Sequence, residues 1–468
     1  MSNSTTEYVN TESIIDNIDV TNDTLTSRGG LSLFVRYLRG IALYPHLERL
    51  FGTIRKTAKG QPVCEIFKQV LCFLIDGTSR RLTSFDRVKE DEGYARTIES
   101  EPDSMLSSHA VKRFFKAFWW PRVYLFRHLL QWLFLWRLRL TEPLFIVLGI
   151  DTMVMDNSEA TKRHGVKPTY KKGVKGFQPL QMTWGRFIID AVFRAGDKHS
   201  NHGDTVEKMV RHIVKKIRRH YRQGVPIIVR LDSGFFDQKL FRAFEKLEIG
   251  YICGGKLYDD LTGYVASLPQ SSWSRYQKTH QAWDFVEFGD CRGNWKRFRR
   301  AIFCRPVCEE RQYLMEFARP DTVLYTNLGR GEAIDEQIAA CGMLELTTAQ
   351  SIIEAYHGRG SDELIHRALK DFGFEELPFK RFVHNAAFYY TMLLAFFLYE
   401  SFKEDVCSPV VEINSYATTL RRKVIDIAAK VVRHAGEITL KVTQATWKGL
   451  NFAELWRRSA APPLFAWA

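Results

Sequence analysis

Four residues in the C-terminal third of the chain have side chains that could act together on a phosphate group. They are Tyr356, Arg359, Glu363 and Lys370, in the segment EAYHGRGSDELIHRALKDFG. Their spacings of three, four and seven residues are close to whole helical turns, so on a single helix they would share one face. Glu363 could then bind a metal ion, while the two cations bind phosphates. We expect this helix to end at Gly373.

Two aspartates far upstream could supply the remaining carboxylates of a metal site. Asp151 follows the apolar run LFIVLGI, and Asp232 follows PIIVRL. Acids at the carboxyl ends of neighbouring strands converge where ligands bind in α/β sheets. With Glu363 they would form a metal-binding triad for two Mg²⁺ or Mn²⁺ ions, the arrangement for two-metal phosphoryl transfer. Asp156 and Asp190 compete for the first position, and we favour Asp151 because it directly ends its strand.

The segments around these acids predict an α/β core. From about residue 143, the chain reads as strand, hairpin, helix, strand, helix and strand. This order predicts a mixed sheet with a ribonuclease-H-like arrangement, over residues 141–255 and again over 346–405. Between them, residues 256–345 alternate between apolar and polar side chains, which predicts a β-rich insertion of antiparallel strands.

The segments that flank the core have other patterns. Residues 1–27 hold five acids and no Lys or Arg, which predicts a disordered acidic tail. Residues 28–140 show helical spacing of apolar side chains and predict an all-helical N-terminal domain. Residues 406–468 are basic, and LRRKVIDIAAKVVRHAG predicts an amphipathic helix, followed by a strand-like piece. This C-terminal region could contact DNA or a second copy of the chain.

One predicted helix of the N-terminal domain carries a basic face. The segment MLSSHAVKRFFKAFWW has a good N-cap at Ser107 or Ser108, and Lys112, Arg113 and Lys116 follow along one side. Such a helix either enters a DNA groove or is an ordinary amphipathic helix with a solvated basic side. The rest of the sequence favours DNA contact.

The overall composition favours a polyanionic partner. The 468 residues carry a formal net charge of +14, with a sequence pI of about 9.3. Nucleic acid is the first expectation and an anionic membrane the second. The apolar runs Val123–Trp136 and Ala386–Tyr399 are shorter than the roughly 20 apolar residues of a membrane span and predict buried helices. With no signal-peptide pattern at the N-terminus, we expect a soluble, cytoplasmic, nucleoid-associated protein without a membrane partner.

The residues singled out above also resemble a known family. Tyr356, Arg359, Glu363 and Lys370 match, at every spacing, the Tyr-x2-Arg-x3-Glu-x6-Lys signature of bacterial insertion-sequence DDE transposases. GIDTMVMD resembles the family's first-Asp block and RLDSGFFD its second, while KGFQPL and VLYTNL resemble flanking blocks. LPFKRFVHNAAFYYTMLLAFFLYE and LRRKVIDIAAKVVRHAG are similar to the branch with an Asp-Ser-Gly-Phe second block. The resemblance covers most of residues 31–450.

The resemblance implies a specific enzyme. Asp151, Asp232 and Glu363 would bind the metal ions, and Tyr356, Arg359 and Lys370 would contact phosphates around the cleaved end of an insertion sequence. Water would attack at each terminal inverted repeat, the freed 3′-hydroxyl would attack the opposite strand to give a hairpin, and the excised element would join target DNA. Because two ends must be held together, a homodimer on double-stranded DNA is expected.

Two features of the resemblance leave alternatives open. The family's insertion stabilises a flipped base and a DNA hairpin, and Trp273, Trp283 or Trp295 could provide that stacking surface or simply pack the insertion's core. Some relatives have an adjacent pair of acids at the first site, where this chain has Thr152, so Asp156 could share metal binding.

Three other functions are compatible with part of the pattern. One is a catalytically inactive or domesticated DNA-binding descendant of a transposase. Another is a ribonuclease-H-like nuclease without strand transfer. The last is a general basic nucleic-acid or membrane-surface protein, which would bind without metal dependence and with strong salt sensitivity.

Overall fold

The computed structural model describes residues 18–54, 60–278, 281–293, 295–307, 321–358 and 360–466; the side chains of residues 360–363 lie outside this description.

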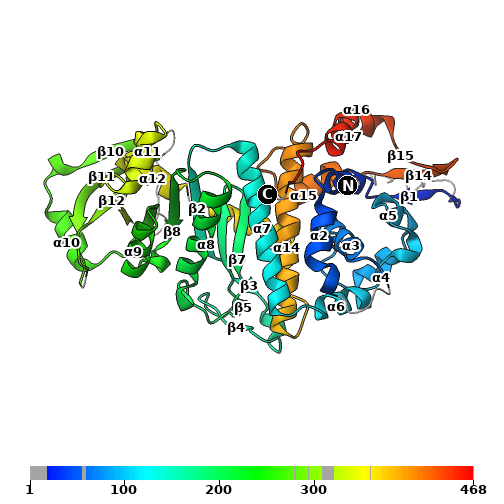
Figure 1. Cartoon of the computed structure of the whole chain (residues 1–468), viewed down its shortest axis with the longest axis horizontal. Helices are drawn as coiled ribbons and strands as arrows, with labels where there is room; N and C mark the ends of the chain where they lie inside the picture. The colour runs from blue at the N-terminus through cyan, green and yellow to red at the C-terminus, as the bar shows by residue number, and fades with distance from the viewer. Residues whose placement is uncertain are drawn as a thin grey trace, which may run out of the picture.

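A nine-stranded mixed sheet forms the centre of one half of the molecule (Figure 1), with the strand order β10-β11-β12-β13-β9-β8-β2-β6-β7. Five of its strands come from the predicted core: β2 (Ile146–Thr152), β6 (Leu180–Trp184), β7 (Phe187–Val192), β8 (Ile227–Leu231) and β9 (Gly250–Gly254). Two helices, α8 (Thr205–His220) and α9 (Gln238–Lys246), connect β7 to β8 and β8 to β9. β2, β8 and β9 are parallel, whereas β6 and β7 form an antiparallel hairpin beside β2. The predicted mixed α/β sheet is therefore confirmed.

The predicted β-rich segment extends this same sheet beyond β9. Its antiparallel strands are β10 (Ser274–Lys278), β11 (Gln281–Asp290), β12 (Arg299–Val307) and β13 (Thr322–Thr326), as the alternating sequence predicted. β13 pairs with β9, Tyr325 opposite Cys253, so these strands share one continuous hydrogen-bonded ladder with the core strands. The segment also contains α10 (Asp259–Ser267) and α11 (Ala333–Ala340).

Helices make up most of the other half of the molecule. They are α1 (Leu31–Gly40), α2 (Leu43–Phe51), α3 (Val63–Asp76), α4 (Ser84–Lys89), α5 (Glu92–Thr97) and α6 (Ser108–Lys116). Two long helices, α7 (Trp120–Thr141) and α14 (Phe382–Phe402), run side by side between these helices and the sheet (Figure 1). Both apolar runs predicted to be buried helices belong to this pair, so that prediction is confirmed.

One stretch within the described residues, Phe382–Cys407, is long and apolar enough to cross a membrane by length and composition alone. Within its apolar window, 89% of the residues are buried inside the molecule. It is surrounded by α7, α3 and β7, as expected for the central helix of a packed core.

The two ends of the chain correct two predictions. Residues 24–26, predicted to be disordered, form β1 (Thr24–Thr26), which pairs with β14 (Ala429–His434); residues 1–17 of the predicted tail lie outside the described residues. β14 in turn pairs with β15 (Glu437–Val442). The C-terminal region is therefore not simply helical, since this hairpin lies between α15 (Ala417–Leu420) and the helices α16 (Gln444–Gly449) and α17 (Phe452–Ala460).

The β14–β15 hairpin forms because its local sequence favours a tight turn between two strands over a helix. Ala435 and Gly436 both have positive φ, as the two-residue turns of tight hairpins require. The β-branched pair Val431 and Val432 lies just before the turn, and such residues favour strands. Helical spacing of the same apolar residues had suggested a helix, but the pairing with β1 decides the outcome.

Candidate active site

The two predicted aspartates lie at equivalent positions on neighbouring parallel strands. Ile150 of β2 is the register partner of Leu231 of β8, and each aspartate directly follows one member of this pair. Adjacent strands are about 4.8 Å apart, so Asp151 and Asp232 emerge side by side at the carboxyl edge of the sheet. Both strands are apolar and buried on both faces, as is typical of parallel strands at the centre of an α/β sheet.

Local hydrogen bonds orient both carboxylates. One oxygen of Asp151 accepts from the Thr152 backbone N–H at 2.7 Å, and the Asp151 side chain is 27% exposed. Asp232 ends its strand and caps a short 3₁₀ turn by accepting from the Gly234 N–H at 2.8 Å. Both acids therefore remain accessible at the edge and have fixed side-chain directions.

Helix α13 (Gly360–Phe372) carries Glu363 and lies beside the same edge. His366 of this helix places its Nδ1 3.9 Å from Asp151 Oδ2, so the first turns of α13 lie beside the end of β2. Glu363 precedes His366 by three residues and so belongs to the same side of the helix. Its side chain lies outside the described residues. His366 is a site residue that the sequence analysis missed, although its spacing from Glu363 could have indicated it.

The donor types at this edge fit a hard divalent cation. Carboxylate oxygens are the ligands that Mg²⁺ and Mn²⁺ prefer, and two of them stand on adjacent strand ends. Within the described part of the chain, no group of three or more His, Cys, Asp or Glu is close enough to hold a metal ion. The predicted set needs Glu363, whose side chain lies outside the described residues.

Tyr356 lies against the neighbouring strand end. It belongs to α12 (Ala349–His357), and a Cβ atom added to Gly254 at the end of β9 would lie 2.3 Å from the Tyr356 hydroxyl oxygen. The same Cβ would be 3.1 Å from the Ser233 N–H, next to Asp232. Gly254 therefore makes room for the phenol beside the second aspartate. The Arg230 guanidinium fixes α12 to β8 by donating to the Ala355 carbonyl at 2.9 Å.

The expectation of one continuous signature helix is wrong. α12 ends at His357 and α13 begins at Gly360, with a turn at Gly358 between them, while Arg359 lies outside the described residues. Two glycines within three residues each cost a helix about 1 kcal/mol relative to alanine, which favours an interruption here. The predicted end of the second helix is confirmed, since α13 stops at Phe372, immediately before Gly373.

Lys370 lies two turns after Glu363 on α13. Its ammonium group forms an ion pair with Glu375, and Glu375 also accepts from the Asp156 backbone N–H at 3.2 Å. The pKa of Asp156 is below its ordinary value, mainly because the Ser158 hydroxyl and N–H donate to its carboxylate, and the nearby Lys370 charge adds to this. Lys370 is thus placed beside the rival acid Asp156.

Asp190, the other rival for the first metal position, has a different role. It is fully buried, and both of its oxygens accept from the Arg127 guanidinium at 2.8 Å. A bidentate pair of this kind uses the carboxylate completely and leaves no solvent-facing oxygen for a substrate.

The predicted basic helix is α6, and Ser107 caps it by accepting from the Ala110 N–H. Arg113 and Lys116 are exposed, and Lys112 is half-buried. Lys112 also lines a groove of about 680 Å³ between the helical half and the core. The other lining residues include Arg80, Arg81, Arg163, Asp156 and Glu375. This groove connects the basic helix with the Glu375 partner of Lys370.

A lysine-rich hairpin beside Asp156 was not predicted. β3 (Met155–Asp156), β5 (Lys175–Phe177) and β4 (Lys167–Pro168) form a three-stranded sheet in that order. The hairpin exposes Lys167, Lys171, Lys172 and Lys175 together with Tyr170. Residues 160–189 contain no Asp or Glu, a signal in the sequence that could have indicated this surface.

The three tryptophans pack against side chains of the extended sheet and of the adjoining core. Trp283 is 4% exposed and stacks on His357 of α12, with ring centroids 4.9 Å apart. Trp295 contacts Phe236, and Trp273 meets Phe303 edge to face. These contacts fit the interpretation that they stabilise the fold, and those of Trp283 also support the helix that carries Tyr356.

Comparison with known proteins identifies a family model that covers most of the chain. The model of the family described as "Transposase DDE domain group 1" matches residues 14–459. No curated protein matches the chain. Among solved structures, the cryo-EM structure of the piggyBac transposase synaptic complex with hairpin DNA is similar over 86% of this chain and 83% of that chain, with 10% sequence identity. Its TM-score is 0.35, at which the likeness carries no structural inference.

Proposed function

Because the chain belongs to the DDE transposase family, group 1, we propose that it is a DNA transposase that binds and cleaves the ends of a mobile element. The observation that supports this best is the register of the sheet. Asp151 and Asp232 follow partnered residues of two parallel strands, and His366 of the Glu363-bearing helix lies 3.9 Å from Asp151. The strand order β7-β6-β2-β8-β9, with a hairpin followed by parallel strands, supports a ribonuclease-H-like core.

In this proposal the triad holds the metal ions. Asp151, Asp232 and Glu363 would bind two Mg²⁺ or Mn²⁺ ions, which when bound would activate the attacking oxygen and stabilise the leaving oxygen. The protein side chains position the DNA around them. Tyr356 lies next to the turn after Asp232, where it can contact a phosphate of the cleaved strand, and the charges of Arg359 and Lys370 would neutralise neighbouring phosphates.

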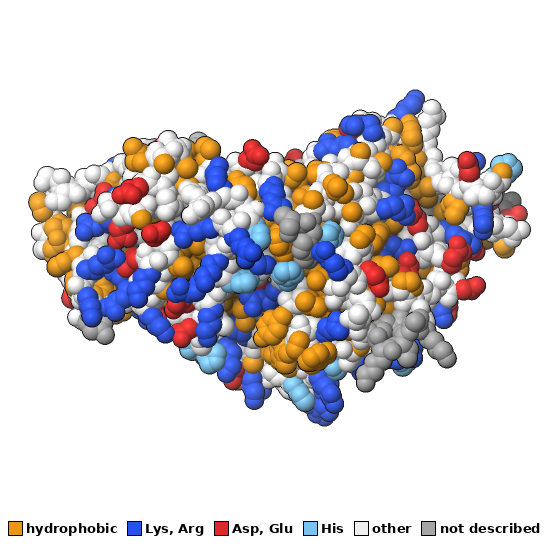
Figure 2. All heavy atoms as spheres, in the orientation of Figure 1, with side chains coloured by type: hydrophobic (Ala, Val, Ile, Leu, Met, Phe, Trp, Pro, Cys, Tyr) orange, Lys and Arg blue, Asp and Glu red, His pale blue; other side chains and the backbone are white. Residues whose placement is uncertain are grey.

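The surface charge supports a long DNA contact. Figure 2 shows Lys and Arg side chains gathered over α8 and α9. A groove of about 520 Å³ between these helices is lined by four cations and two acids, namely Arg211, Lys239, Arg242, Lys246, Glu207 and Asp237. Lys112, Arg113 and Lys116 of α6 would contact the duplex from the helical half. Exposed cations of this number favour a polyanion whose counterions are released on binding.

The complete reaction would follow the insertion-sequence pathway. Hydrolysis at each terminal inverted repeat would free a 3′-hydroxyl, which would attack the opposite strand through a hairpin product, and the element would then join target DNA. Two ends held together imply a homodimer on DNA, in the cytoplasm and associated with the nucleoid. A nuclease without strand transfer would share only the first of these steps.

Cleavage of a labelled duplex that carries the element's own terminal repeat tests the proposal. The full chain is compared with Asp232→Asn, and with Asp197→Asn as a control that makes the same change at another exposed acid. We expect nicking or a hairpin product in Mg²⁺ or Mn²⁺ from the unmodified chain and the control, and none from Asp232→Asn. Tight end binding without cleavage in either metal would contradict the proposal and favour an inactive DNA-binding descendant.

A further inference from the structure

An arginine-lined pocket lies at the edge of the sheet opposite the two aspartates. It has a volume of about 440 Å³ and includes Tyr251, near the amino end of β9, whereas Asp232 follows the carboxyl end of β8. The three steps along β9 from Tyr251 to Gly254 span about 10 Å, so the pocket lies apart from the carboxylate edge. Its charged lining residues are Arg297, Arg299, Arg300, Arg330, Glu245 and Glu332, with a formal net charge of +2.

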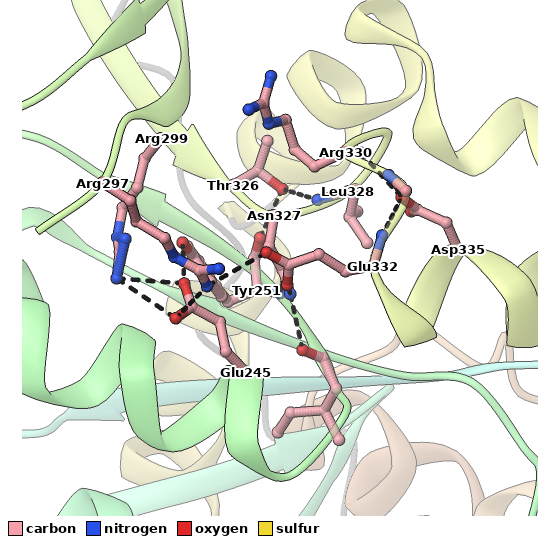
Figure 3. Close-up of polar contacts among 12 residues, drawn as sticks. Glu245, Tyr251, Arg297, Arg299, Thr326, Asn327, Leu328, Arg330, Glu332 and Asp335 are labelled. Atoms are coloured by element: carbon pink, nitrogen blue, oxygen red, sulfur yellow. Dashed lines mark hydrogen bonds and ion pairs between the residues drawn. The ribbon is translucent and has the colours of Figure 1, made fainter.

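Two of these arginines share one carboxylate (Figure 3). Glu245 accepts from Arg299 at 3.1 Å and also from Arg297, which reaches Glu332 at 3.2 Å. The Arg299 side chain is only 3% exposed, and within the described residues its Nε has no hydrogen-bond partner. A buried donor without an acceptor is costly, so the pocket has more donor capacity than its own acids use.

Arg300 has a different role in the same pocket. Its guanidinium donates to the carbonyl oxygens of Leu328 and Thr347 at 2.8 and 2.7 Å, and it also pairs with Glu287. All of its donor groups are therefore used. Arg300 fixes the loop that follows β13 and is not available to a ligand.

That loop presents Arg330 at the rim of the pocket. Gly329 and Gly331 on either side have φ of +70°, and the three N–H groups of residues 329–331 donate to the Asp335 carboxylate at 2.7–2.8 Å. The loop is thus held rigidly before any ligand binds. Figure 3 shows the Arg330 guanidinium pointing away from Glu332, and no described residue forms an ion pair with it.

An exposed aromatic ring completes the site. Phe298 lines the pocket, is 64% exposed and lies between Arg297 and Arg299 in the run KRFRR. Guanidinium groups bind phosphates, and an exposed ring stacks on bases of any sequence. From this combination we infer that the pocket binds one nucleotide unit, its phosphate on Arg297 and Arg330 and its base on Phe298.

The inference rests on the proposed function, under which the bound nucleotide is part of a DNA strand. Given the distance from Asp232, the bound unit belongs to a DNA segment other than the phosphate undergoing cleavage. A free nucleotide offers the same chemistry, so the experiment has to distinguish the two sources. It also has to separate this pocket from the rest of the basic surface.

Binding of the full chain to fluorescein-labelled DNA is measured in EDTA, so that metal-dependent cleavage does not contribute. Arg330→Ala and Phe298→Ala alter exposed side chains, and Arg87→Ala removes the same charge from an exposed position on α4. We expect Arg330→Ala to weaken binding of single-stranded DNA several-fold and to lower the salt slope by about 0.7, the value for one phosphate contact on a single strand. Phe298→Ala should weaken binding by about 5-fold or more without changing that slope.

Two results would overturn the inference. If both variants bind DNA as Arg87→Ala does, the pocket has no role of its own in DNA binding. If DNA binding is unaffected but a deoxynucleoside monophosphate raises the unfolding temperature of the unmodified chain and not of Arg330→Ala, the ligand is a free nucleotide and the DNA assignment is wrong. Absence of cleavage in Mg²⁺, with the Arg330→Ala effect intact, would contradict the transposase proposal and leave the pocket in place.

Discussion

At the carboxyl ends of β2 and β8 the sheet presents acids, whereas at the amino end of β9 it presents arginines. The acids stand directly on strand ends, partly exposed, with a helix placed against them. The arginines come from turns and from the extension of the sheet, and two of them are balanced by Glu245. The same sheet can therefore offer a phosphate two environments: one that needs a cation between protein and phosphate, and one that already supplies the positive charge.

The largest effect on cleavage should come from substitutions at the carboxyl edge of the sheet, where the two aspartates lie. Asp151→Asn is expected to lower the rate of metal-dependent cleavage by at least about 100-fold, because replacing even the outer-shell partners of a metal site costs 10–100-fold. Asp156→Asn should change the rate little, since its carboxylate is engaged by Ser158. Initial cleavage rates at saturating Mg²⁺ measure both. Equal losses would show that Asp156 shares the metal.

Asp190→Asn distinguishes a structural acid from the acids at the edge. Removing one partner of its buried pair with Arg127 should lower the free energy of unfolding by about 3–5 kcal/mol, because the other charge stays buried. Asp151→Asn, at an accessible strand end, should leave the unfolding midpoint nearly unchanged. Denaturant unfolding compares the two, and the contrast fails if Asp151→Asn proves as destabilising as Asp190→Asn.

Gly254→Ala tests the contact of Tyr356 with the strand end. The added Cβ would lie 2.3 Å from the Tyr356 oxygen, so the phenol must move; we expect slower cleavage and a loss of about 1–3 kcal/mol in stability. Adding Tyr356→Phe should recover most of the stability, because the crowded atom is gone. Gly263→Ala on α10, where a Cβ meets nothing within 4 Å, is the control. An unchanged melting temperature in Gly254→Ala would exclude this close approach.

The smallest effect concerns His128, whose ring lies beside the Lys216 ammonium group. Burial lowers the pKa of His128 to about 4, and the Lys216 charge contributes further. Because the folded-state pKa lies below the unfolded value of about 6.5, this group favours folding above that pH, and its contribution is lost as pH falls toward 4. The half-exposed ring limits the change to about 1 kcal/mol. His128→Gln should flatten the pH dependence of unfolding between pH 6.5 and 4; an unaltered profile would contradict the shift.

The sequence was most informative where a pattern repeats within one element. The apolar runs before Asp151 and Asp232 predicted both strands, whereas their parallel register is known only from the structure. Helical spacing placed Glu363 and Lys370 correctly on one helix, but it could not show that Gly358 separates them from Tyr356. The Trp283–His357 stacking that supports the first helix joins residues far apart in the chain.

Pairings over long sequence distances were not predictable. The contact of Gly254 with Tyr356 depends on how α12 is placed on the end of β9, which no local pattern specifies. The arginine pocket likewise combines residues from α9, β12 and the loop after β13. The run KRFRR was visible as a basic segment, but its pocket exists only because β12 joins the central sheet.

The pairing of β1 with β14 ties the start of the described chain to a strand made some 400 residues later. The Gly29 N–H donates to the Ile427 carbonyl at 2.8 Å, so the first helix is also attached to that late segment. At about 5–20 residues per second, translation separates the two by roughly 20–80 s. The helical half is thus synthesised first, but its contacts are completed last. A chain released early would leave the edge of β1 unpaired. Completion of synthesis is in this sense a condition for completing the N-terminal half.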